Sequence, residues 1–155
     1  MLIDYLYVAV FASFPEALFI LLLGFNLSNV RDVRLSKILI IATIQSIVAL
    51  LVRMSNIYFG FHTIIQIISL YFMVILFMKI KYYKAIIPVL IGMLSQGVLQ
   101  GIILPINSIL REIEMTDLYY NSKYLILAYI PISLVSLLVL IVIIRKNLFL
   151  CDIND

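Results

Sequence analysis

Five long runs of apolar residues, separated by short polar breaks, organise the whole chain. Each run is continuously hydrophobic, whereas a membrane β-strand would alternate apolar and polar positions. A membrane-spanning helix needs about 20 predominantly apolar residues, and it satisfies its backbone hydrogen bonds internally. The pattern therefore predicts an all-α integral membrane protein, a bundle of five transmembrane helices over residues 5–25, 38–52, 61–78, 85–106 and 124–144.

The composition strengthens this assignment. Hydrophobic residues make up 65% of the 155 residues and charged residues only 12%, against roughly 45–50% and 25% in soluble domains. Five spans account for about 100 residues, so the remainder is sufficient for loops only. We therefore expect one polytopic membrane domain over residues 1–155, with no kinase, nucleotide-binding or DNA-binding module in this chain.

The distribution of basic residues predicts the orientation. Cytoplasmic loops of membrane proteins carry an excess of lysine and arginine. Eight of the 11 basic residues fall in the three segments that five spans would place on one side. The predicted localisation is the cell membrane, with the N-terminus outside and the C-terminus in the cytoplasm, and the net charge of +3 needs no nucleic-acid partner. The eight are Arg31, Arg34, Lys37, Lys79, Lys81, Lys84, Arg145 and Lys146.

The longest connection, residues 107–123, is amphipathic. Its apolar residues Ile109, Leu110, Ile113 and Leu118 are spaced to share one face of a helix. This spacing predicts a short interfacial helix on the outer surface. Such a helix would either cap the bundle or offer a contact surface to a ligand or partner.

Glu16 is the most informative polar residue, because it lies about 16 Å deep at 1.5 Å per residue. An ionised carboxylate at that depth is costly, so we expect it to be neutral or hydrogen-bonded. Pro15 removes one backbone hydrogen bond there and predicts a kink. By the same arithmetic Gln45 lies about 12 Å deep and Gln96 about 15 Å deep, so the three polar side chains are expected to share one layer.

Two further glutamines, Gln66 and Gln100, are expected in a shallower layer. These polar groups serve either as interhelical hydrogen bonds or as a site for a ligand, ion or proton. In the fourth predicted span, Gly97 and Gly101 form a GxxxG pattern that permits close helix approach. That contact is either with another helix of the same chain or with a second protein.

Candidates for metal or covalent chemistry are few. Cys151 is the only cysteine and His62 the only histidine, and the predicted topology puts them on opposite sides of the membrane. We therefore expect no metal site, no cofactor and no enzymatic activity. Arg53 and His62 flank the predicted outer turn between the second and third spans, where a histidine could respond to pH or simply hydrogen-bond a neighbour.

This outer turn also carries a resemblance. The run from Arg53 through Phe59, Gly60, His62, Thr63, Ile64 and Ile65 resembles the membrane input domain of sensor histidine kinases of the accessory-gene-regulator type in Firmicutes. An opening PEALFILLLGF span followed by a basic loop is similar in layout. The resemblance implies a role in signalling. Those kinases continue into a cytoplasmic ATP-binding domain, so this chain corresponds to the input portion, as a fragment or as a stand-alone relative.

Three functions remain open. The first is a membrane sensor or regulatory module that passes an extracellular or intramembrane signal to a cytoplasmic partner. The second is a small membrane subunit of a transport complex, and the third is a structural or accessory subunit of a larger assembly. The expected partners are the lipid bilayer and either a second copy of the chain or another membrane or cytoplasmic protein; the ligand is open.

Overall fold

The computed structural model describes residues 2–30, 33–55, 61–111 and 122–153. Within them the chain forms helices joined by short connections, and no strand is present in these described segments. The elements are α1 (Leu2–Val8), the π-helical turn η1 (Ala9–Ser13), α2 (Phe14–Leu27), α3 (Leu35–Met54), α4 (Phe61–Met78), α5 (Tyr82–Arg111) and α7 (Ser122–Lys146).

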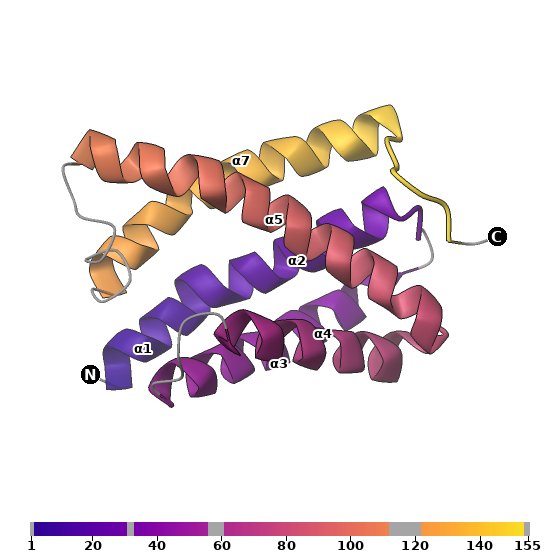
Figure 1. The fold of residues 1–155 in the computed structure, drawn as a ribbon, viewed down its shortest axis with the longest axis horizontal. Helices are drawn as coiled ribbons and strands as arrows, with labels where there is room; N and C mark the ends of the chain where they lie inside the picture. Colours follow the sequence, from indigo (N-terminus) through magenta and orange to yellow (C-terminus); the bar gives the residue numbers. More distant parts are fainter. Residues whose placement is uncertain (1, 31–32, 56–60, 112–121, 154–155) are drawn as a thin grey trace.

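Five helical segments among the described residues are long and apolar enough to cross a membrane. The elements α1, η1 and α2 form one continuous segment, Ile3–Leu27, and α3, α4, α5 and α7 supply the other four. The predicted all-α class and its five spans are confirmed, and the protein is a multi-pass helical membrane protein. The termini lie at opposite ends of the bundle (Figure 1). We call these ends the N-terminal end and the C-terminal end.

The helices extend beyond the predicted apolar runs, because a helix continues through polar residues after it leaves the hydrocarbon region. The third predicted span coincides with α4, whereas α5 is several residues longer at each end than residues 85–106. Of the interfacial helix predicted over residues 107–123, residues 107–111 belong to α5 and residues 122–123 to α7. The rest of this prediction falls on residues 112–121, which lie outside the described residues.

A π-helical turn interrupts the first span immediately before Pro15. The Phe14 N–H donates to the carbonyl of Ala9, five residues back, instead of four. Proline has no N–H and its ring collides with the carbonyl four residues earlier, so the backbone before it must widen or bend. The irregularity predicted from Pro15 is therefore present, and it lies next to Glu16.

Helices α2 and α5 touch backbone to backbone through one glycine on each. A Cβ atom on Gly24 would stand 2.0 Å from the Pro88 carbonyl oxygen, and one on Gly92 would stand 2.0 Å from the Ile20 carbonyl oxygen. Only glycine permits this approach. The Gly24–Gly92 contact thus fixes how α2 sits on α5.

The predicted GxxxG contact, formed by Gly97 and Gly101, lies on another part of α5 and has no helix of the described chain against it. A Cβ on Gly97 or Gly101 would have nothing within 4 Å, and both residues are exposed. The reading in which these two glycines pack against another helix of the same chain is therefore wrong for the described residues. Their neighbours Leu94, Val98 and Ile102 are exposed too, so this face of α5 is apolar and directed away from the protein.

Helix α2 is central to the apolar packing. One cluster joins it to α3, α4 and α5 through residues such as Ile20, Ile41 and Leu70. Another joins it to α7 through Leu23 and Leu140. A third cluster joins α1 and η1 to α7 through Val8 and Ile132. Many large apolar side chains outside the three clusters are exposed, as expected where lipid replaces water.

The residues after α7 fold back across the C-terminal end of the bundle (Figure 1). We call residues 147–153 the C-terminal tail. The backbone N–H groups of Leu150 and Cys151 donate to the carbonyl of Leu27, over 2.7 and 3.3 Å. Lys84 donates to the Ile153 carbonyl over 2.6 Å, and Ile153 is buried. The tail is thereby attached to the ends of both α2 and α5.

Candidate functional site

Among the described residues, polar side chains of the spans form three hydrogen-bonded groups, apart from single bonds to the backbone such as the one that Asn107 Nδ2 donates to the Ala128 carbonyl over 3.3 Å. One joins α2, α5 and α7 around Glu16, one joins α3 and α4, and one joins α5 and α7. Buried polar groups need partners in a hydrocarbon environment, and the helices supply them from one another.

Glu16 is hydrogen-bonded, as expected, but its partner differs from the prediction. Gln100 Nε2 donates to Glu16 Oε1 over 2.6 Å. Tyr129 of α7, which is buried, makes a further side-chain hydrogen bond with the same carboxyl. We call Glu16, Gln100 and Tyr129 the Glu16 group. It ties three helices together at one point, and the predicted partners Gln45 and Gln96 are not part of it.

Unused hydrogen-bonding capacity lies beside this group. Ser13, one turn before Glu16 in η1, has a buried hydroxyl with no hydrogen-bond partner among the described residues. The same holds for Nε of Arg53 on the last turn of α3. The Arg53 guanidinium lies within electrostatic reach of the Glu16 carboxyl and of the His62 ring. Buried donors without partners are uncommon in native structures and call for a water, ion or ligand.

Gln45 belongs to the second group, between α3 and α4. Its Nε2 donates to the backbone carbonyl of Gln66 over 3.2 Å, and Ser69 Oγ donates to its Oε1 over 2.9 Å. The Gln66 amide in turn lies 3.1 Å from Nε2 of His62. The chain of contacts therefore runs from Gln45 to the first turn of α4, and His62 has the hydrogen-bonded neighbour that the simpler reading expected.

Gln96 belongs to the third group. The hydroxyl of Ser136 on α7 donates to Gln96 Oε1 over 3.0 Å, and both side chains are buried. Within the described segments this pair shares no hydrogen bond with Glu16 or Gln45. The single layer predicted for Glu16, Gln45 and Gln96 is therefore wrong, and the polar residues pair off between neighbouring helices.

The length of α5 explains the wrong pairing. Depth counted from Ile106 puts Gln96 level with Glu16. The helix continues to Arg111, five residues further, which moves every position of α5 about 7.5 Å deeper. Gln100 is then about 16 Å from the helix end, the depth estimated for Glu16. The depth count therefore put Gln96 level with Glu16, where the structure has Gln100, because it started from the wrong end of the helix.

Three members of these groups were not singled out from the sequence: Tyr129, Ser136 and Ser69. Each lies in a strongly apolar run, where tyrosine and serine are common and cause no break in hydrophobicity. A signal was available for Ser69, which is three residues from Gln66 and shares its helix face. Nothing comparable in the sequence distinguishes Tyr129 from the tyrosines near the ends of the spans.

Among the described residues no group of three or more histidine, cysteine, aspartate or glutamate side chains could hold a metal ion. The site is thus a single carboxyl with amide, phenol, hydroxyl and guanidinium neighbours. Such a set can bind a polar group by hydrogen bonds or exchange a proton at Glu16. The arrangement defines a helical membrane protein with a polar centre midway along its first span.

Comparisons with known proteins add no relative to this description. No family model, no curated protein and no solved structure matches the chain.

Proposed function

We propose that this chain is a signal-sensing or regulatory membrane module, which passes a signal from outside the cell or from within the membrane to a cytoplasmic partner. One observation carries the proposal. The three helices that meet at Glu16 are α2, α5 and α7, and the same three helices hold the C-terminal tail at the C-terminal end of the bundle. The site and the tail are therefore connected by shared helices.

A change at the Glu16 group has a direct path to the tail. Glu16 and Leu27 lie on α2, separated by 11 residues or about 16 Å. The Gly24–Gly92 contact lies between them and locks α2 to α5. A shift of α2 against α7 at Glu16 would therefore reach the Leu27 carbonyl, where two tail hydrogen bonds end. The π-helical turn beside Glu16 is a suitable hinge for such a shift, since π-turns often mark functional positions.

The polar donors left over near Glu16 indicate where the signal would act. The hydroxyl of Ser13 and Nε of Arg53 have no partners among the described residues, and Arg53 reaches the N-terminal end of the bundle. A ligand or water with hydrogen-bond acceptors would satisfy both groups. The resemblance of residues Arg53–Ile65 to the input domains of accessory-gene-regulator-type kinases supports the same role.

The open glycine face favours a second candidate, an accessory subunit of a larger membrane assembly. Gly97 and Gly101 face away from the chain and permit close approach by another helix. A regulatory module also needs a partner, so this face is the proposed contact with a second copy or another membrane protein under either function. The Gly97/Gly101 face therefore supports association with another helix, but it does not distinguish a regulatory module from an accessory subunit.

The proposed transmission predicts that a change at Glu16 alters the tail at the C-terminal end. Cys151 is the only cysteine, and it is half-buried with its N–H bonded to Leu27. Maleimide modification of its thiol therefore reports opening of the tail. In the purified chain in lipid nanodiscs, Glu16→Leu should change the rate of Cys151 modification by about threefold or more, because the tail is held by weak local contacts.

The matched control is Gln45→Leu. It removes a buried amide at a similar depth, but its contacts lie on α3 and α4, which do not hold the tail. Its Cys151 modification rate should equal that of the wild type. Equal rates in the wild type and in Glu16→Leu, with both chains folded, would contradict transmission between Glu16 and the tail.

The proposed orientation is tested with the same cysteine. Because the basic residues gather at the C-terminal end, this end should face the cytoplasm. A membrane-impermeant maleimide should leave Cys151 unmodified in intact cells and should modify it in inside-out vesicles. Arg34→Cys in a Cys151→Ser background should behave alike. Strong modification of either position from outside would overturn the orientation.

A further inference from the structure

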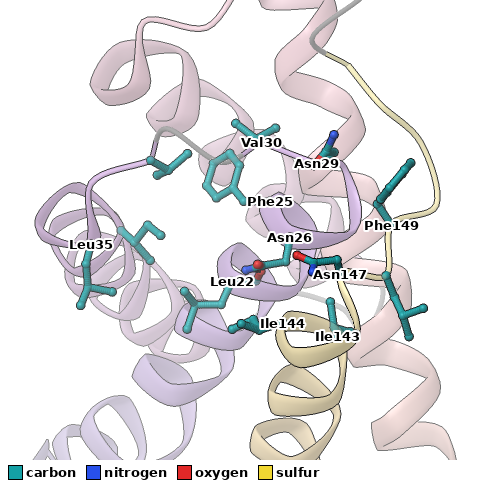
Figure 2. A pocket seen from close by; sticks show the side chains of 13 residues that line it. Leu22, Phe25, Asn26, Asn29, Val30, Leu35, Ile143, Ile144, Asn147 and Phe149 are labelled. Carbon is teal, nitrogen blue, oxygen red and sulfur yellow. Dashed lines mark hydrogen bonds between the residues drawn. The ribbon is translucent and has the colours of Figure 1, made fainter.

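A cavity of about 270 Å³ opens at the C-terminal end of the bundle, and none of the residues of the Glu16 group lines it. It is enclosed by the end of α2, the start of α3, the end of α7 and the C-terminal tail (Figure 2). Most of its lining is apolar, including Leu22, Phe25 and Ile143. The volume is slightly below the range typical of sites for whole small molecules, roughly 300–1,000 Å³. It therefore suits part of a larger, mainly apolar ligand.

Amide groups interrupt the apolar lining. Asn26 and Asn147 lie in the middle of the lining, between Leu35 of α3 and Phe149 of the tail (Figure 2). The Asn26 amide donates to the Leu22 carbonyl over 2.8 Å, which leaves its oxygen and second N–H available. The Asn147 side chain has no hydrogen-bond partner within the described segments. The cavity can therefore hydrogen-bond a polar group as well as cover an apolar one.

Basic residues surround this cavity. Arg34 directly precedes the lining residue Leu35, and Lys37 directly precedes Ile38. Arg145 and Lys146 stand between the lining residues Ile144 and Asn147. Adjacent Cα atoms are about 3.8 Å apart, so the backbones of all four basic residues lie next to the lining, and we call these four residues the rim cations.

One acid at this end is already engaged. Asp152 of the tail accepts a hydrogen bond from Asn29 over 2.5 Å. Of the four rim cations, Arg34, Arg145 and Lys146 are exposed and Lys37 is half-buried. The described part of the rim is therefore strongly positive, and it lies where the ends of the spans meet lipid headgroups.

We propose that this cavity binds an anionic phospholipid, with an apolar segment of the lipid against the α2, α3 and α7 lining and its phosphate among the rim cations. Charge complementarity selects the occupant. Phosphate oxygens accept strong hydrogen bonds from arginine and amide N–H groups, and basic pockets between spans are suited to acidic headgroups. Because Leu148 and Phe149 of the tail form one wall, the bound lipid would also hold the tail closed.

The test measures binding of fluorescent phosphatidylglycerol to the purified, delipidated full chain, in competition with unlabelled lipids. Phosphatidylglycerol should compete well, phosphatidylcholine poorly, and inorganic phosphate hardly at all, because only the anionic lipid satisfies both parts of the site. Arg34→Gln with Arg145→Gln should weaken phosphatidylglycerol binding about 25-fold, roughly fivefold for each cation removed.

A matched control removes the same number of positive charges from residues that do not adjoin the cavity. Lys79→Gln with Lys81→Gln removes two cations from the same end, and neither residue adjoins the lining. This pair should stay within about twofold of the wild type, since only rim cations contact the phosphate. Equal binding of phosphatidylglycerol and phosphatidylcholine, or an equal loss in both double variants, would overturn the proposal in favour of diffuse surface charge.

Discussion

Alanine at Gly24 or Gly92 is expected to disrupt the bundle. The added methyl group would stand 2.0 Å from a backbone carbonyl oxygen of the facing helix, and a backbone atom cannot move aside as a flexible side chain can. Overpacking a core costs about 1–3 kcal/mol and sometimes more, and we expect each alanine variant to lose about 3 kcal/mol or more. The free energy of unfolding in detergent, measured by titration with a denaturing detergent, gives the result directly.

Gly97 and Gly101 supply the matched control. Alanine at either position would meet nothing within 4 Å, so the free energy of unfolding of the monomer should stay within about 0.5 kcal/mol of the wild type. Isoleucine at both positions should abolish any oligomer seen by size-exclusion chromatography and leave the monomer folded. Unfolding of this double variant, or tolerance of alanine at Gly24 and Gly92, would contradict the helix contacts described above.

The contrast between the two glycine pairs shows what the sequence could and could not predict. Gly97 and Gly101 were visible as a pattern because they lie four residues apart on one helix. Gly24 and Gly92 lie on two different helices, and only the fold brings them together. A contact of this kind has no periodicity along the chain, so the pattern on one helix indicated the wrong face.

The number and class of the helices were predictable for a physical reason. The bilayer requires apolar runs of about 20 residues with satisfied backbone groups, and this requirement acts on the sequence directly. Polar pairing is less constrained, since any two helices at a suitable depth can supply partners. Glu16 was recognised as a hydrogen-bonded carboxyl, but Gln100 and Tyr129 depended on the true length of α5 and on its position against α7.

Leucine at Glu16 is expected to destabilise the bundle much more than glutamine. Leucine leaves the Gln100 amide and the Tyr129 hydroxyl without their acceptor, and an unsatisfied buried polar group costs about 1–3 kcal/mol. We expect a loss of about 2–3 kcal/mol in the free energy of unfolding. Glutamine keeps an acceptor oxygen and a donor, so Glu16→Gln should lose less than about 1 kcal/mol, in line with the modest strength of hydrogen bonds between membrane helices.

A double-mutant cycle assigns the effect to the Glu16–Gln100 hydrogen bond. Gln100→Leu alone should be destabilising, and Glu16→Leu with Gln100→Leu should lose less than the two single changes together, because partners in one hydrogen bond are coupled. Additive losses would show that the two side chains act separately. Glu16→Gln also separates a structural role of Glu16 from a role in signalling. If this variant is as stable as the wild type but its Cys151 is modified at a different rate, the carboxyl itself carries the signal. A rate like the wild type's would assign Glu16 to helix packing, since the amide then serves as well as the acid.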